Sequence, residues 1–260
     1  MSVNYLSLSI SDGIAQIVID RADKRNAMSL EMWGEMRRLV TAATSDRSAL
    51  AIVLRGVDVT AFASGADIEE MLSIATTDDA WALMDAVRSA EQALSDCPKP
   101  VIAMIRGFCI GGGIELALGC DLRFAAKTAT FAVPPAKLGL VYSLSSTKRL
   151  IELVGLGRAR DLLYSARSFD AAEAFRMGLV ERVFKDDEIE QKTLEYAELL
   201  ARRSQYSIRA AKRVSAAAIA GGSDDDKEIR DLRAAAFSGE DLKEGLAAFV
   251  SKRVPGFSWR

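Results

Sequence analysis

The chain contains no histidine in its 260 residues. This absence excludes Ser-His and Cys-His nucleophile pairs within the chain, because both need an imidazole to accept the proton of the nucleophile. It also argues against a zinc site, so we expect no metal. Any proton transfer therefore has to involve carboxylates, tyrosine, lysine, cysteine or water.

Cysteine, long apolar runs and net charge are also scarce. Cys97, Cys109 and Cys120 are an odd number without metal-ligand spacing, which favours buried, inert thiols in a reducing compartment. The longest apolar runs, such as residues 101–105, are far too short to span a bilayer, and residues 1–4 lack the pattern of a signal peptide. A net charge of -2 gives no reason to expect nucleic acid or a membrane surface as partner. We therefore expect a cytoplasmic protein.

Alternating strand and helix patterns predict an α/β fold in the first half of the chain. A β-hairpin is indicated around residues 11–13, a helix capped by Ser29 follows, and residues 101–105 are typical of a buried strand. From residue 145 onward the pattern is helical, apart from a short strand predicted at residues 179–183. Further strands are predicted at residues 50–54, 122–125 and 130–133, and further helices near residues 68–72, 78–97, 146–154, 157–166, 171–177, 187–203, 206–220, 224–237 and 240–251.

The sequence Gly-Gly-Gly-Ile-Glu at residues 111–115 joins a predicted buried strand to a predicted apolar helix. Glycines at a helix start allow close approach of the backbone to a ligand, and the first N–H groups of the helix point outward without intrahelical partners. These groups and the helix dipole favour an oxygen that carries negative charge. Glu115 lies about one turn on from Gly112, along roughly the same face. The arrangement suits enolate chemistry, although a tight packing turn is the alternative for the glycines alone.

Short motifs spread over nearly the whole chain carry a family resemblance. They are R-A-D-K-R-N-A-M at residues 21–28, A-F-A-S-G-A-D-I-E-E-M at residues 61–71, K-P-V-I-A-M-I-R-G-F-C-I-G-G-G-I-E-L-A-L at residues 99–118, C-D at residues 120–121, K-L-G at residues 137–139 and E-G-L-A-A-F-V-S-K-R at residues 244–253. Taken together and in this order, they resemble the enoyl-CoA hydratase/isomerase (crotonase) superfamily.

The resemblance implies a crotonase-like α/β fold and a mode of assembly. A spiral of ββα units is expected over residues 1–195, followed over residues 196–260 by a helical C-terminal region that serves trimerisation and the CoA pocket. Assembly as a homotrimer or a homohexamer is expected. The family needs no cofactor, since the coenzyme A thioester is itself the substrate.

The resemblance also implies site residues. The backbone N–H groups of Ala66 and Gly112 would form an oxyanion hole for the thioester carbonyl of an acyl-CoA, and each such donor is worth roughly 3–4 kcal/mol in comparable sites. Glu115 matches a catalytic glutamate of the family, and Phe249 and Lys252 match positions that contact CoA across a subunit boundary. For Lys252 a solvated charge is an equally good interpretation. The residues implied in substrate binding are Asp23, Lys24, Arg25, Ser64, Ala66, Asp67, Ile68, Gly111, Gly112, Phe249 and Lys252.

Two departures from the family pattern concern the chemistry. Hydratases of the family typically use a second glutamate, and its position is occupied here by Pro135. A Gly-rich loop that helps to place the attacking water is replaced by residues 142–146. Tyr142 matches a tyrosine in members that decarboxylate methylmalonyl-CoA, but these carry a histidine at the position of Ala66. Tyr142 either assists Glu115 or is a packed aromatic with a satisfied hydroxyl.

Three functions therefore remain open at this point. The favoured one is an enoyl-CoA hydratase, a lyase of EC 4.2.1.17 type in fatty-acid or related acyl-CoA metabolism, with Glu115 handling the protons. The second is another enolate reaction on acyl-CoA, such as decarboxylation, isomerisation or hydrolysis, although isomerases that use the second glutamate alone are disfavoured by Pro135. The third is an acyl-CoA-binding protein with little turnover.

Overall fold

Two β-sheets lie at the centre of the computed structural model, which describes residues 5–259. Residues 1–4, on which the expectation about a signal peptide rests, lie outside the described residues. The predicted hairpin forms the edge of the larger sheet, whose first two strands pair antiparallel while its other neighbours are parallel. The larger sheet has the order β1 (Leu6–Ser11), β2 (Ile14–Ile19), β3 (Ala51–Gly56), β5 (Val101–Ile105), β7 (Leu122–Ala126) and β10 (Arg182–Phe184). The smaller sheet has the order β4 (Ala61–Ala63), β6 (Phe108–Ile110), β8 (Thr130–Ala132) and β9 (Ser168–Asp170).

The chain repeats a unit of two strands and a helix. The first strand of each unit joins the larger sheet (β3, β5, β7), and the second joins the smaller sheet (β4, β6, β8). Equivalent strands of successive units lie side by side and parallel in both sheets. This arrangement is the spiral of ββα units that the family resemblance implied.

The central strands are apolar throughout because both faces of the larger sheet are covered. In β3, Ile52 and Leu54 point into the main hydrophobic core, whereas Ala51 and Val53 point into a second cluster on the opposite face. All five residues of β5 are buried in the same alternating manner. A continuous run of five apolar residues therefore marks a strand between two helical layers.

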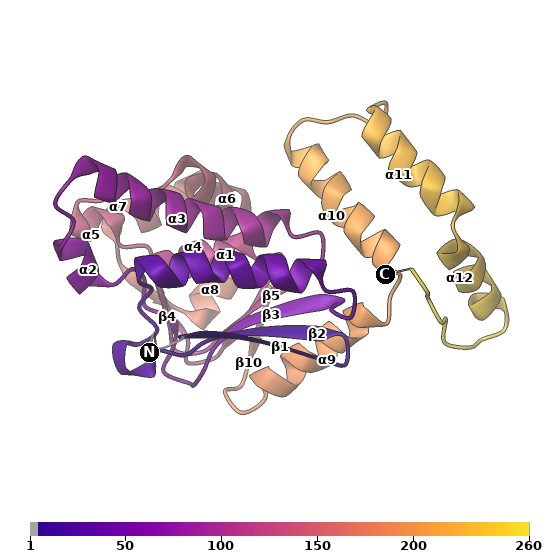
Figure 1. Ribbon diagram of the computed structural model, residues 1–260, viewed down its shortest axis with the longest axis horizontal. Helices are drawn as coiled ribbons and strands as arrows, with labels where there is room; N and C mark the ends of the chain where they lie inside the picture. Colours follow the sequence, from indigo (N-terminus) through magenta and orange to yellow (C-terminus); the bar gives the residue numbers. More distant parts are fainter. Residues whose placement is uncertain (1–4, 260) are drawn as a thin grey trace.

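Helices form these two layers. Figure 1 shows α1 (Leu30–Ser45) and α3 (Thr77–Asp96) side by side over one face of the sheet, and α9 (Ile189–Ala201) packs on β3, β5 and β7 from the other face. The Ser29 side chain accepts a hydrogen bond from the Met32 amide and so caps α1, as predicted. The remaining helices are α2 (Ile68–Leu72), α4 (Gly112–Gly119), α5 (Pro135–Leu138), α6 (Leu144–Val154), α7 (Leu156–Ser165), α8 (Ala171–Met177), α10 (Gln205–Ile219), α11 (Lys227–Ser238) and α12 (Glu240–Val250), with a short 3-10 turn at Ala22–Lys24.

The last three helices, α10, α11 and α12, extend to one side of the sheets (Figure 1). The division of the chain predicted at residue 195 falls inside α9, whose Ile189, Thr193 and Ala197 are buried. No helix within residues 5–259 has both the length and the apolar character needed to cross a membrane.

The predicted strand at residues 179–183 begins too early. Gly178, with φ +87°, ends α8, and the amide of Leu179 donates to the carbonyl of Ala174. Leu179 and Val180 therefore complete the helix terminus, and the strand β10 starts only at Arg182. Strands β4, β6 and β9 were not predicted, because three residues are too few for a periodic pattern.

Candidate active site

Two turns that follow neighbouring strands of the smaller sheet meet at one edge. Strands β4 and β6 are parallel neighbours, so their carboxyl ends lie together. The turn after β4 leads through residues 64–67 into α2, and the turn after β6 leads through Gly111 into α4. The amide nitrogen of Ala66 lies 3.6 Å from the point that a Cβ on Gly112 would occupy. The parallel pairing thus brings together two segments that are about 45 residues apart in the sequence.

The glycine run is needed for this close approach. Gly111 has φ +57°, a region that side-chain-bearing residues seldom adopt. A Cβ on Gly113 would lie 2.1 Å from the carbonyl oxygen of Ala63, at the end of β4. The first glycine therefore serves the turn, and the third allows α4 to pack against the other strand. This geometry supports the packing interpretation of the run.

A methyl group on Gly113 is expected to destabilise the fold. In Gly113→Ala the new Cβ meets backbone that cannot rotate away, so we expect a loss of about 3 kcal/mol or more of unfolding free energy, at the upper end of overpacking costs. Gly34→Ala is the matched control, because Gly34 lies within α1 with nothing within 4 Å of its Cβ position. This variant should gain about 0.5–1 kcal/mol. Urea unfolding of both variants measures the difference, and equal stabilities would contradict the close approach.

Two backbone N–H groups at the meeting point are left without acceptors. The amide of Gly111 donates to Ala132 and the amide of Glu115 donates to Gly111, at 3.1 and 3.2 Å. Among the described residues, the amides of Ala66 and Gly112 donate to no backbone or side-chain acceptor. An unpaired N–H at the start of an eight-residue helix is a ready donor to an anionic oxygen.

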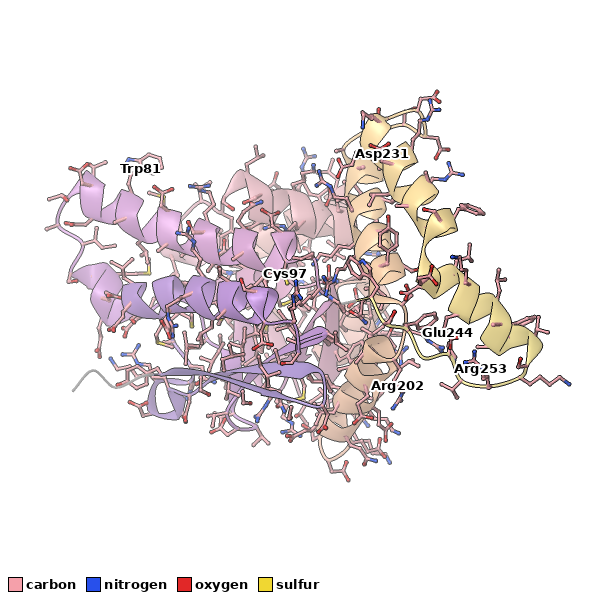
Figure 2. All side chains as sticks on the ribbon, turned by 45° about the vertical axis from the view of Figure 1, so that its right-hand side comes forward. Trp81, Cys97, Arg202, Asp231, Glu244 and Arg253 are labelled. Carbon is pink, nitrogen blue, oxygen red and sulfur yellow. The ribbon has the colours of Figure 1, made fainter. Side chains whose placement is uncertain are left out.

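A cavity of about 610 Å³ opens beside these two amides. Its walls come from α2, from the first half of α3, from the start of α4 and from residues 134–143. Most of the exposed side chains at its mouth are apolar, among them Trp81, Leu138 and Val141. Figure 2 shows Trp81 projecting from α3. Of the site residues predicted from the sequence, the cavity is lined by Ser64, Ala66, Ile68, Gly111, Gly112, Glu115 and Tyr142.

Glu115 is the carboxylate at the inner end of this cavity, and its side chain lies in the first turn of α4. The residue is 9% exposed. Burial raises the pKa of Glu115 to about 8, the negative charge of Glu91 adds to the rise, and the nearby Ser146 hydroxyl opposes it. Glu115 therefore keeps its proton at neutral pH and can deliver it to an atom in the cavity.

This raised pKa predicts how stability depends on pH. The unfolded chain loses the Glu115 proton near the ordinary value of 4.5, whereas the folded chain keeps it until about pH 8. Between these values the folded state binds more protons, so the Glu115 contribution to the free energy of unfolding falls as pH rises. Glu115→Gln removes this dependence, and its stability relative to the parent chain should increase from pH 5 to pH 8. Thermal unfolding of both proteins across this range measures the effect; parallel curves would contradict it.

Tyr142 and Pro135 complete the inner wall of the cavity. The hydroxyl of Tyr142 is buried and has no hydrogen-bond partner among the described residues. Burial, together with the nearby charge of Glu115, raises the pKa of Tyr142 far above its usual range. Tyr142, which lines the cavity, therefore carries a neutral hydroxyl. Pro135 is the first residue of α5, where its missing N–H is tolerated.

Some of the predicted CoA-binding residues, in the 3-10 turn near residue 23 and at the start of α2, do not line the cavity. Asp67 caps α2 by accepting from the Glu69 amide, and it pairs with Arg21 at 2.8 Å and with Lys24 at 3.5 Å. Lys24 also pairs with Glu69 at 2.5 Å. The guanidinium of Arg25 lies over the ring of Phe108. These pairs hold the segment in place, and a phosphate would have to compete for Lys24. Asp23 lies in the neighbouring 3-10 turn.

Phe249 and Lys252 lie far from the cavity of the same chain. Both lie in or just after α12, between Glu244 and Arg253 in the sequence. Figure 2 labels Glu244 and Arg253 and shows them at the opposite end of the molecule from Trp81, which lines the cavity. Phe249 is 84% exposed. The structure thus does not bring these two predicted residues to the site within one chain.

A second buried carboxylate near the cavity was not predicted from the sequence. Glu91 on α3 is 1% exposed and accepts a hydrogen bond from the Ser146 hydroxyl at 2.7 Å. It occupies a position between Val87 and Leu94, on the side of α3 that packs inward. The sequence pattern that could have indicated this residue is a glutamate at a position within the apolar stripe of a predicted helix.

Comparisons with known proteins agree with this architecture and site. The family model of enoyl-CoA hydratase/isomerase matches residues 9–260. The chain is 34% identical to a crotonyl-CoA hydratase of Syntrophomonas wolfei over 99% of both chains, and 31% identical to a short-chain-enoyl-CoA hydratase of Clostridium acetobutylicum over the whole of both. A crystal structure assigned to the enoyl-CoA hydratase/isomerase family, from Hyphomonas neptunium, superposes with a TM-score of 0.96 and 39% identity over 98% of both chains.

The chain belongs to the enoyl-CoA hydratase/isomerase family. The family and the crotonase-like α/β fold predicted from the motifs are confirmed. The predicted enzyme class agrees with the names of these relatives.

Proposed function

We propose that the protein is an enoyl-CoA hydratase, which adds water across the C2–C3 double bond of a 2-enoyl-CoA. The observation that carries the proposal is the pair of unpaired amides, Ala66 and Gly112, in one cavity with a protonated Glu115. The thioester carbonyl is the group that such amides suit, because charge moves onto its oxygen when a nucleophile adds at C3. The apolar mouth of the cavity suits an acyl chain.

The proposed chemistry follows from these positions. Donors at Ala66 and Gly112 stabilise the enolate that forms as the oxygen of water bonds to C3. Glu115, which holds its proton at neutral pH, then protonates C2. The reverse reaction uses the same carboxyl group as a base. No cofactor enters this scheme, since the CoA thioester is the substrate.

The relatives support this choice among the reactions of the family. Curated proteins at 31–36% identity over nearly the whole chain are named as hydratases of enoyl-CoA or crotonyl-CoA. The unpartnered hydroxyl of Tyr142 favours a second candidate, decarboxylation of an acyl-CoA, because a neutral donor in the cavity suits a carboxylate substituent at C2. Both candidate reactions pass through an enolate. Hydration adds water to the substrate, whereas decarboxylation releases carbon dioxide from it.

A panel of thioesters separates the candidates. Purified protein is incubated with enoyl-, malonyl- and 3-oxoacyl-CoA esters, and the products are identified by mass spectrometry. We expect a gain of one water by crotonyl-CoA, with loss of its enoyl-thioester absorbance. Loss of carbon dioxide from the malonyl ester alone would favour decarboxylation, and binding without any product would indicate an acyl-CoA-binding protein.

Assembly is a further part of the proposal. Large apolar side chains are exposed on the C-terminal helices, and in a single chain Phe249 and Lys252 lie away from the cavity. Contact of α12 with the cavity of another copy explains both observations, so we propose a homotrimer or a homohexamer. The three cysteines are free and buried, which fits the cytoplasmic location that we propose. Light scattering on the purified protein determines its mass in solution.

A further inference from the structure

Hydration needs two proton transfers, one to C2 of the substrate and one away from the attacking water. Glu115 supplies the proton for C2, but the attacking water must also lose a proton. Pro135, at the position of the second family glutamate, can accept none. The inference below rests on the proposed hydratase function and concerns the group that takes the proton of water.

A chain of hydroxyls leads from the cavity to Glu91. Ser143 lines the cavity, and its Oγ lies 2.6 Å from the Oγ of Ser146. The hydroxyl of Ser146 donates to Oε1 of Glu91 at 2.7 Å. Both distances lie within the usual range for O–H···O bonds, and both serines sit at the start of α6, where Ser143 is the N-cap. The two hydroxyls therefore have fixed positions between the cavity and a buried carboxylate.

The direction of this chain follows from counting protons. A serine hydroxyl has one proton, and Ser146 gives its proton to Glu91. The bond between the two serines must then be donated by Ser143 and accepted by Ser146. One lone pair of the Ser143 oxygen accepts from the Ser146 amide at 3.0 Å, which leaves the other lone pair as an acceptor. The Ser145 hydroxyl lies 3.0 Å from the same oxygen and competes for it. A water in the cavity that donates to Ser143 is thus connected to Glu91 by hydrogen bonds that all point the same way.

We propose that Glu91 accepts the proton of the attacking water through the hydroxyls of Ser143 and Ser146. In the forward step the water oxygen bonds to C3 and its proton passes to Ser143. The Ser143 proton moves to Ser146, and the Ser146 proton moves to Glu91. At the same time the π electrons of the double bond form the enolate, which takes the Glu115 proton at C2. Both serines end as neutral hydroxyls, Glu91 ends protonated and Glu115 ends ionised, so the net charge is unchanged.

The resting state is restored through the same serine. Ser146 donates to Glu91, and its hydroxyl is also close enough to Glu115 to lower the pKa of that carboxyl group. Ser146 can therefore pass its proton to Glu115 while it takes one from Glu91. The charged group that faces Glu91 from α6 is Arg149, with 3.4 Å between its Nη1 and Oε2 of Glu91, and the group that faces it from α4 is Glu115. Burial raises the pKa of Glu91, and Ser146 and Arg149 oppose this rise. For Glu115 burial raises the pKa further, to about 8, and the charge of Glu91 adds to that rise. The pair thus rests with its one proton on the carboxyl group that lines the cavity.

Glu91→Gln and Ser146→Ala test the relay. The amide oxygen of Gln still accepts a hydrogen bond from Ser146 but takes no proton, and Ser146→Ala breaks the chain while it leaves the pair of Glu91 with Arg149. With crotonyl-CoA we expect kcat to fall about 100-fold in each variant, with KM within about threefold of the parent value. The double variant should be no slower than the slower single variant, because the two residues act as a unit. The acidic limb of the kcat profile against pH should disappear in Glu91→Gln.

A purely structural role of Glu91 is distinguished by Glu181→Gln, a matched control. Glu181 also accepts from an arginine, Arg123, but lies in the loop before β10 and does not line the cavity. It should keep the parent kcat and pH profile even if its stability falls. If the parent protein hydrates crotonyl-CoA and Ser146→Ala or a folded Glu91→Gln keeps kcat within twofold, the relay is wrong and the hydratase function stands. If the parent protein hydrates no enoyl-CoA, the proposed function fails and the relay fails with it.

Discussion

Glu115→Gln should lower kcat for hydration by about 10³-fold or more and leave the affinity for the CoA thioester within a few fold. Gln has nearly the same shape as the carboxyl group, but it can neither donate the proton to C2 nor remove it in the reverse direction. The two amides that hold the thioester oxygen belong to backbone and are unchanged by the substitution. The effect should therefore appear in kcat rather than in binding.

Kinetics with crotonyl-CoA and calorimetric binding of the saturated ester butyryl-CoA separate these two quantities. Glu190→Gln is a suitable control, because Glu190 pairs with Arg106 from α9 and does not line the cavity. This control should retain the parent activity. Retained turnover in Glu115→Gln would remove Glu115 from the mechanism and direct attention to Tyr142.

Ala66→Pro should lower kcat/KM by about 10²–10³-fold. Proline has no N–H group, so the substitution removes one of the two proposed oxyanion donors, and the loss of one such donor costs about 3–4 kcal/mol in comparable sites. The turn itself is held by other bonds. Met28 donates to the Gly65 carbonyl at 2.8 Å and Asp67 donates to the Met28 carbonyl at 2.9 Å, and neither bond uses the Ala66 amide.

The matched control is Ala66→Gly, which keeps the N–H group and adds backbone freedom. It should lose less than tenfold in kcat/KM. Far-UV circular dichroism and thermal unfolding establish that the proline variant is folded. A folded Ala66→Pro protein with activity close to that of Ala66→Gly would show that the Ala66 amide does not stabilise the enolate.

Local patterns in the sequence were sufficient to predict much of the fold. The apolar run at β5 and the Ser29 cap of α1 are confirmed because burial on both sides of a strand and capping at a helix start are read from adjacent residues. The displaced strand near residue 182 and the missed strands β4, β6 and β9 depend on pairing partners far along the chain. The periodicity of apolar residues within one segment does not predict which distant strand it pairs with.

The sequence by itself also determined the family and the composition of the site. The absence of histidine restricted proton transfer to carboxylates, tyrosine, lysine, cysteine or water, and the glycine run before Glu115 predicted an anion-binding helix start. Tertiary structure alone decided which groups meet. The parallel pairing of β4 with β6 brings Ala66 beside Gly112, and the packing of α3 against α4 and α6 buries Glu91 near Glu115. Burial then keeps the proton on Glu115, because the charged form of a buried carboxyl group loses its hydration. The degree of burial follows from tertiary packing and cannot be deduced from the residue types in the sequence.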